Sequence, residues 1–141
     1  MDRVIAGLWL GDFEDCRQIS GIDESRAVMT LCEAKPPLPP SVLHIHLPIR
    51  DEIYLLPDLW GRLIGTLTAL MDQGKAPLVH CRLGVSRAPT LVAGYLLTTG
   101  QASTPDAALA FLQNCRPCVR PHPATWQGMV AFWQESQHAA S

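Results

Sequence analysis

Several features that would mark a membrane protein or a nucleic-acid-binding protein are missing from the sequence. No uncharged apolar stretch is long enough to cross a bilayer, and no basic N-terminal region precedes an apolar run. The formal net charge is −2, so there is no basic excess that would release counterions from nucleic acid or an anionic membrane. We therefore expect a soluble, cytoplasmic protein that is not exported and that binds neither nucleic acid nor membranes.

Repeats, linkers and low-complexity blocks are also missing. The proline cluster at residues 36–40 comes nearest, and it predicts a stiff loop rather than a domain boundary. The chain has 141 residues, 48% of them hydrophobic and 17% charged, which is typical of one folded domain rather than a disordered segment. We predict a single domain over residues 1–141, and we expect a monomer.

The cysteines do not form an obvious disulfide framework. There are five of them, an odd number at scattered positions, which indicates a reducing compartment. Cys115 and Cys118 have the spacing of a redox or zinc half-site, but no second pair follows, and a loop role is favoured. His44 and His46 fall on one face of a predicted strand, where we interpret them as solvated or packed on the sheet rather than as metal ligands. We expect no metal and no cofactor.

Apolar patterns along the chain predict strands that alternate with helices. Strands are predicted at Ala27–Cys32 and Val42–Leu47, and a further apolar run at Ala76–Val79 leads into His80. Helices are predicted at 58–73 and 88–97, from Thr104-Pro105 onward, and from His122-Pro123 onward. This alternation predicts an α/β fold with a central, mainly parallel sheet flanked by helices, in which ligands gather beyond the carboxyl ends of strands.

The most informative segment lies at such a strand end. Residues 80–87 read His-Cys-Arg-Leu-Gly-Val-Ser-Arg, so Cys81 opens a short loop and Arg87 closes it, with five residues between them. A helix follows at once, so the backbone amides of the loop converge near a helix N-terminus, which stabilises a dianion. Such a position also favours the thiolate, the nucleophilic form of cysteine. The planar guanidinium of Arg87 can bind two phosphate oxygens, and the segment predicts an anion site with a thiol at its floor.

The other loop residues have supporting roles in this hypothesis. Gly84 permits a backbone conformation or a close approach that a side chain would block. Ser86 is counted with the catalytic residues, because it is suited to hydrogen-bond the Cys81 sulfur and help it act as a leaving group; it is also suited to cap the helix, and the two roles are compatible. His80 is expected to orient the loop through hydrogen bonds rather than to transfer protons. Contacts with the phosphate are expected from Arg82, Leu83, Gly84, Val85, Ser86 and Arg87.

This loop, with a histidine in front and Gly-x-Ser-Arg at its end, resembles the compact, atypical type of cysteine-dependent dual-specificity protein phosphatase. Residues 4–11 resemble the opening strand of that family, residues 47–51 with 58–59 its general-acid loop, and residues 115–121 the segment before its last helix. The resemblance covers most of the chain. It implies a protein-tyrosine-phosphatase-like fold and a hydrolase that dephosphorylates phosphotyrosine and phosphoserine or phosphothreonine through a phosphocysteine intermediate.

The same resemblance implies that Asp51 is the general acid. It would protonate the leaving group and then activate water against the phosphocysteine. A solvated loop aspartate is the plain alternative for Asp51, and Asp58 is a rival acid, although Asp58-Leu59 is also typical of a helix N-cap. His122-Pro123 stands where the family often has Pro-Asn, so an asparagine that commonly braces the active-site loop is absent.

Other functions share parts of this pattern. A non-catalytic phosphate-binding module would be expected to lose the cysteine or the acid, whereas Cys81, Arg87 and Asp51 are all present. A rhodanese-like sulfurtransferase usually has one residue fewer between its cysteine and arginine. The substrate is expected to be a phosphorylated protein or a small phosphomonoester. A nucleotide, inositide or RNA 5′-phosphate stays open, although Arg82 and Leu83 make the loop only modestly suited to one.

Overall fold

The computed structural model describes residues 1–19 and 26–139. Within them a five-stranded sheet has the order β1-β2-β5-β3-β4. Its strands are β1 (Asp2–Ile5), β2 (Leu8–Gly11), β3 (Ala27–Thr30), β4 (Leu43–His46) and β5 (Leu78–His80). β2, β5, β3 and β4 are parallel, and β1 is an antiparallel edge strand. The predicted α/β fold with a mainly parallel sheet is confirmed.

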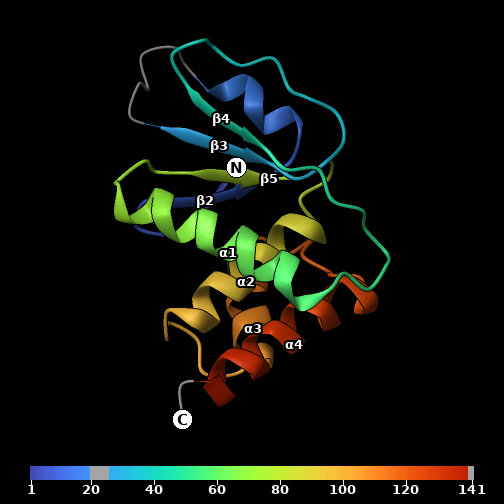
Figure 1. Cartoon of the computed structure of the whole chain (residues 1–141). Coiled ribbons are helices and arrows are strands. Elements are labelled where there is room, and N and C mark those ends of the chain that lie inside the picture. The colour runs from blue at the N-terminus through green and yellow to red at the C-terminus, as the bar shows by residue number, and fades with distance from the viewer. Residues whose placement is uncertain (20–25, 140–141) are drawn as a thin grey trace.

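Four helices lie on one side of the sheet (Figure 1). They are α1 (Pro57–Asp72), α2 (Arg87–Thr98), α3 (Pro105–Cys115) and α4 (Pro123–Ala139). α2 is central, because it contacts β2 and β5 and also the other three helices. Every residue from Ala88 to Leu97 is buried. Helix α2 is thereby held firmly on the sheet, with its N-terminus at the carboxyl end of β5.

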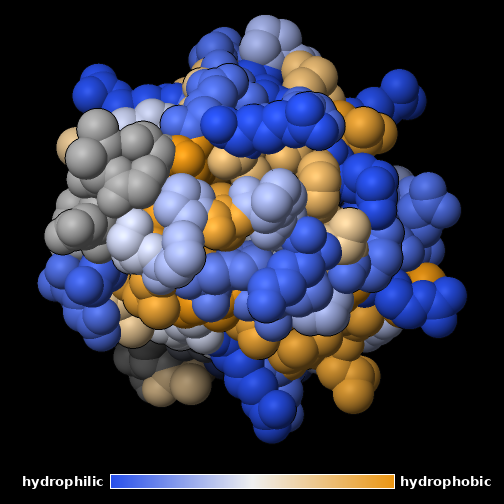
Figure 2. Space-filling model, turned by 90° about the horizontal axis from the view of Figure 1, so that it is seen from above, coloured by the Kyte–Doolittle hydropathy of each residue, from blue (hydrophilic) through white to orange (hydrophobic). Residues whose placement is uncertain are grey.

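The opposite side of the sheet has a thinner cover. The short 3₁₀ helix η1 (Glu14–Gln18) and the proline-rich loop lie there, and they enclose a second apolar cluster of Cys16, Ile19, Val28, Val42 and Leu78. Seen from this side, hydrophilic residues cover most of the surface, with hydrophobic residues visible between them (Figure 2). In the described part of the chain, no helix combines the length and the apolar character needed to span a membrane.

The predicted opening strand at residues 4–11 is wrong in one respect, because it is two strands. Gly7 has a φ of +81°, in the left-handed region that glycine enters at little cost. The turn at Ala6-Gly7 folds β2 back onto β1 as its antiparallel partner. The apolar residues run through this turn without a break, so Gly7 was the sole local sign of it.

The helix starts agree with the sequence except at α1. Thr104 is the N-cap of α3, and its hydroxyl accepts a hydrogen bond from the Ala107 amide at 3.1 Å, as predicted. Helix α1 has Leu56 as its N-cap and Pro57 in its first turn, so the prediction that Asp58 caps the helix is wrong. Asp58 lies in the first turn instead, where the helix dipole stabilises a negative charge.

Candidate active site

The loop that joins β5 to α2, residues 81–86, is called the Cys81 loop below. It is short, and both of its ends belong to buried elements, because His80 ends β5 and Ser86 is the N-cap residue of α2. Cys81 is 3% exposed, and its Sγ accepts a hydrogen bond from the Ala88 amide in the first turn of α2, at 3.4 Å. The sulfur therefore lies at the N-terminus of a helix, as the sequence predicts.

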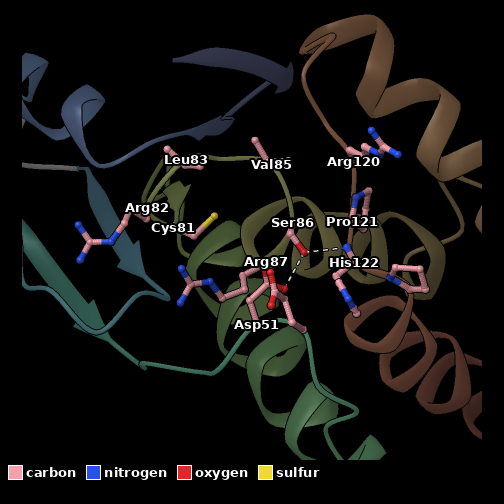
Figure 3. A pocket seen from close by; sticks show the side chains of 12 residues that line it. Asp51, Cys81, Arg82, Leu83, Val85, Ser86, Arg87, Arg120, Pro121 and His122 are labelled. Carbon is pink, nitrogen blue, oxygen red and sulfur yellow. Dashed lines mark hydrogen bonds between the residues drawn. The ribbon is translucent and has the colours of Figure 1, made fainter.

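A pocket of about 480 Å³ opens beside this loop (Figure 3). Most of the predicted site residues line it, namely Asp51, Cys81, Arg82, Leu83, Val85, Ser86 and Arg87. His80 and Gly84 do not line the pocket. Their contacts with neighbouring residues shape the loop, as described below. The segment that leads into α4 supplies lining residues to which the sequence analysis gave no role, namely Arg120, Pro121, His122 and Pro123. The sequence signals for this segment were the family resemblance of residues 115–121 and the His122-Pro123 step that replaces the family's Pro-Asn.

Arg87 is held in place before any ligand binds. Its Nη1 donates to the Ile49 carbonyl oxygen at 3.1 Å and to Glu33 Oε2 at 3.4 Å, and 12% of its side chain is exposed. The exposed Arg82 donates to the other oxygen of Glu33 at 3.0 Å. The backbone amide of Glu33, with Arg82 and Arg87, lowers the pKa of Glu33 to about 2. No feature of the sequence pointed to Glu33, which joins the two arginines at the pocket.

Asp51 lies on the loop between β4 and α1, residues 47–56, called the Asp51 loop below. Its Oδ1 accepts a hydrogen bond from Ser86 Oγ at 2.8 Å (Figure 3). It also accepts one from Thr125 Oγ1 at 2.8 Å. Each hydroxyl oxygen in turn accepts a backbone amide, from His122 at 2.9 Å and from Glu52 at 3.1 Å respectively. An amide can only donate, so both hydroxyl hydrogens point at the carboxylate.

These bonds favour the ionised form of Asp51. Burial acts to raise its pKa, but the hydrogen bonds from Ser86 and Thr125, the Glu52 amide and the charge of Arg87 together lower the pKa below its usual value. The rival Asp58 is exposed and does not line the pocket. Of the two candidate acids, only Asp51 therefore lies in the pocket.

Ser86 does not make either of the hydrogen bonds predicted for it. The side chain forms no cap to α2, and its hydroxyl donates to Asp51 rather than to the Cys81 sulfur. A hydroxyl carries one hydrogen, so it cannot donate a hydrogen bond to the carboxylate and to the sulfur at the same time. In this conformation Ser86 links the Cys81 loop to the Asp51 loop.

His80 anchors the Cys81 loop to the sheet. Its Nδ1 lies 3.1 Å from the Cys81 carbonyl oxygen, which only accepts, so Nδ1 donates. Nε2 then accepts from the Thr30 hydroxyl at 2.7 Å, and that oxygen accepts from His44 Nε2 at 2.7 Å. Burial lowers the pKa of His80 and favours the neutral ring. These contacts suit the orienting role expected of His80.

Arg116 braces the loop from the other side, although the sequence analysis gave it no role. Its Nε donates to the Gly84 carbonyl oxygen and its Nη2 to that of Leu83, both at 3.0 Å. Its Nη1 binds Asp2 at 2.9 Å, which fixes the guanidinium. The absence of the bracing asparagine therefore does not leave the loop unsupported.

Gly84 meets both of the needs predicted for it. Its φ is +68°, and a Cβ atom there would lie 2.6 Å from the Gly11 carbonyl oxygen and 2.7 Å from Arg116 Nη2. A side chain would strain the backbone and push away the guanidinium that braces the loop. Gly84 thus shapes the loop rather than lining the pocket.

The remaining cysteines and the His44–His46 pair do not line the pocket, although His44 contacts it indirectly through Thr30 and His80. Cys115 ends α3, Cys118 is exposed in the loop that follows, and all five cysteines are free. His44 and His46 stack with ring centroids 5.9 Å apart on β4. Over residues 1–19 and 26–139, no group of three or more His, Cys, Asp or Glu side chains is arranged to hold a metal ion.

Comparison with known proteins places this site in a family. The chain is 26% identical over 143 residues to human dual specificity protein phosphatase 15, covering 99% of this chain and 48% of that protein. It is 25% identical to human dual specificity protein phosphatase 22, covering 98% of this chain and 76% of that protein. The crystal structure of human DUSP28 superposes with a TM-score of 0.84 at 22% identity, over 100% of both chains, which shows the fold.

The catalytic-domain model of the dual specificity phosphatases matches residues 13–135, most of the chain. The predictions of a compact, atypical family member and of a cysteine-dependent protein phosphatase domain are thereby confirmed. The chain belongs to the dual specificity phosphatase family.

Proposed function

We propose that this protein removes phosphate from phosphotyrosine and from phosphoserine or phosphothreonine in proteins, through a phosphocysteine intermediate. The observation that carries the proposal is the convergence of Cys81, Arg87 and Asp51 in one pocket at the N-terminus of α2. A nucleophile, a cation for the phosphate and an acid for the leaving group are the groups that this hydrolysis needs.

In the first half-reaction, the Cys81 thiolate attacks phosphorus. The S–P bond forms as the P–O bond to the substrate oxygen breaks, and Asp51 gives its proton to that oxygen, which leaves as a tyrosine, serine or threonine hydroxyl. Arg87 and the backbone amides of the Cys81 loop bind the non-bridging phosphate oxygens, where negative charge is spread in the transition state. Because Ile49 and Glu33 already position Arg87, little reorganisation is needed at that moment.

In the second half-reaction, a water molecule attacks phosphorus. The Asp51 carboxylate takes a proton from the water, the S–P bond breaks, and the sulfur leaves with the electron pair as the thiolate, so that inorganic phosphate is released. The Ala88 amide near Cys81 Sγ stabilises the leaving thiolate. The hydrogen bonds that favour ionised Asp51 suit this step, in which Asp51 acts as a base.

The same residues argue against a non-catalytic phosphate-binding module. Such a module needs the cation and the loop amides, but it has no use for a carboxyl held by two hydroxyls beside a cysteine. We also propose that residues 1–141 act as one catalytic domain and as a monomer in a reducing, cytoplasmic setting. Five free cysteines support the reducing setting.

The test is hydrolysis of phosphotyrosyl and phosphoseryl peptides, with a metal chelator present, by the wild type and by Cys81→Ser. We expect turnover of both peptides by the wild type and none by the variant. Vanadate should inhibit the wild type competitively, because it mimics the phosphoryl group in the pocket. A folded wild type that binds vanadate but turns over neither peptide would favour the binding module. Turnover of p-nitrophenyl phosphate without peptide turnover would point to a non-protein substrate.

A further inference from the structure

Thr125 differs from the other threonines in helices. Thr66, Thr68 and Thr98 donate to a carbonyl oxygen four residues earlier in their own helix. Thr125 lies in the first turn of α4, as Thr90 does in α2, but Thr90 also donates to a carbonyl oxygen four residues earlier, that of Ser86 at 2.7 Å. Its side chain is fully buried, with 0% exposed, and its hydroxyl donates to Asp51 Oδ1 at 2.8 Å. A buried hydroxyl in α4 is thus directed at the acid of the site.

The same hydroxyl also fixes the backbone next to the acid. Its oxygen accepts a hydrogen bond from the Glu52 amide at 3.1 Å. Glu52 has a φ of +65°, in the left-handed region that a residue with a side chain occupies at a cost in free energy. That conformation persists where surrounding contacts determine it, and the bond to Thr125 is such a contact. Thr125 therefore holds both the Asp51 carboxylate and the turn that follows it.

We propose that Thr125 is a positioning residue for the general acid, which holds the Asp51 loop in its strained conformation and orients the Asp51 carboxyl toward the substrate. The inference rests on the proposed function. The two hydroxyls that hold the carboxyl, those of Ser86 and Thr125, both donate to Oδ1 rather than to Oδ2. The proton that reaches the leaving group therefore belongs on Oδ2, and Thr125 keeps that oxygen in a defined orientation.

The surroundings of Asp51 fix the sign of a pH effect. Charged and titratable groups line the pocket with Asp51, from α2, the Cys81 loop, the segment before α4 and its own loop, namely Arg87, Cys81, Arg82, Arg120, His122 and Glu52, and among them the charge of Arg87 lowers its pKa. Removing the Thr125 hydroxyl leaves all of them in place and takes one donor from the ionised carboxylate. The pKa of Asp51 should then rise. The first half-reaction needs protonated Asp51, so the basic limb of the kcat/KM profile should move to higher pH.

The experiment compares Thr125→Val, which keeps the shape and loses the hydroxyl, with Thr125→Ser, which keeps the hydroxyl. Each is assayed from pH 3 to 8 with phenyl phosphate, a poor leaving group, and with p-nitrophenyl phosphate, a good one. At low pH, where Asp51 is protonated in every variant, we expect Thr125→Val to lower kcat/KM for phenyl phosphate about tenfold, because a misplaced acid transfers its proton less effectively, and to affect p-nitrophenyl phosphate less. Its basic limb should shift upward, and Thr125→Ser should match the wild type.

A second set of variants separates positioning from damage to the fold. On an Asp51→Asn background, Thr125→Val should cause no further loss of kcat/KM for phenyl phosphate, because the acid on which it acts is gone. Should Thr125→Val fail to fold, as judged by circular dichroism, Thr125→Ala on both backgrounds gives the same comparison.

Two results would overturn the inference, and they are distinguishable. If the wild type loses activity in Cys81→Ser and loses its basic limb in Asp51→Asn, yet Thr125→Val keeps both the leaving-group dependence and the basic limb, the role of Thr125 alone is wrong. If the wild type has no turnover, or if Cys81→Ser keeps it, the proposed function fails and the inference fails with it.

Discussion

The Cys81 loop and the Asp51 loop meet in one pocket, but they are held in place by different means. The Cys81 loop is short, its ends belong to the buried β5 and α2, and Arg116 and His80 bind its carbonyl groups. The Asp51 loop is longer and more exposed: Tyr54 is 49% exposed and Leu56 is 71% exposed. Its position next to the pocket depends on a few hydrogen bonds to distant residues.

The geometry of the two loops therefore depends on the stability of the fold to different degrees. The Cys81 loop is fixed by elements that also form the core, so its geometry is as stable as the fold. Backbone hydrogen bonds from Leu47 and Ile49 join the start of the Asp51 loop to Thr30 and Leu31. The Asp51 carboxyl itself is held by bonds from Ser86 and Thr125, which can break without unfolding the sheet. Substitutions in the Cys81 loop that lower activity should therefore also lower the stability of the fold more often than substitutions in the Asp51 loop do.

The largest effect should come from the nucleophile. Cys81→Ser should lower kcat at least about 10⁴-fold, because a serine hydroxyl is a much poorer nucleophile at neutral pH. Vanadate should still bind, since Arg87 and the loop amides are retained. The matched control is Cys118→Ser, which alters an exposed cysteine outside the pocket and should keep wild-type kinetics in the same peptide assay.

Asp51→Asn tests the contribution of the Asp51 loop. General acid catalysis typically contributes 10²- to 10⁴-fold, so kcat/KM for phenyl phosphate should fall about 10³-fold. The wild type requires protonated Asp51, whose pKa lies below its usual value, so its kcat/KM should fall as pH rises above that pKa. An amide does not titrate there, so the variant should lose this basic limb. A basic limb that persists in Asp51→Asn would mean that another group is the acid, and Asp58→Asn would be tested next.

Arg87→Lys tests the residue that touches both loops. Lysine keeps the charge but cannot bind two phosphate oxygens in one plane or reach the Ile49 carbonyl with the same geometry. We expect kcat/KM to fall roughly 10²-fold, the scale of losing a transition-state donor. Arg82→Lys, at the exposed partner of Glu33, should cost much less. Equal losses in the two variants would contradict the distinct role given to Arg87.

Arg116→Met tests how far the stability of the protein depends on the contacts that brace the Cys81 loop. Of these variants it has the smallest expected effect on kinetics. It leaves two loop carbonyls and Asp2 without their partner, and should lower the free energy of unfolding by about 2–3 kcal/mol. Activity should fall by less than in the variants above, since Arg116 does not line the pocket. Chemical denaturation measures the first effect, with the exposed Arg62→Met as the control. Unchanged stability would show that the loop does not need this brace.

The two loops also differ in how much the sequence revealed. Cys81 and Arg87 belong to one octapeptide between a strand and a helix, so local patterns predicted their placement. Thr125 lies 74 residues from Asp51 and carried no signal, because its role depends on which way the first turn of α4 faces. Glu33 and Arg116 were missed for the same reason, since an exposed acid and a basic loop residue look ordinary until the fold brings them to the Cys81 loop.

Local errors in the fold have a similar cause. The apolar pattern of residues 4–11 suits one strand as well as a hairpin, and the choice depends on the backbone of Gly7. Asp58 has the residue type of an N-cap, but with Pro57 as the first helical residue the N-cap of α1 is Leu56, two positions earlier. Periodicity thus predicted the elements, whereas single backbone conformations decided their ends.

The most direct test of the central claim, that Cys81 carries the phosphoryl group, is to trap it. The wild type is mixed with a peptide whose phosphotyrosine bears radiolabelled phosphate, quenched in denaturant during turnover and digested. The account predicts label on the peptide that contains Cys81, and none in Cys81→Ser. Turnover that proceeds with no label on Cys81, with label recovered at another residue or only in free phosphate under conditions that preserve phosphocysteine, would contradict it.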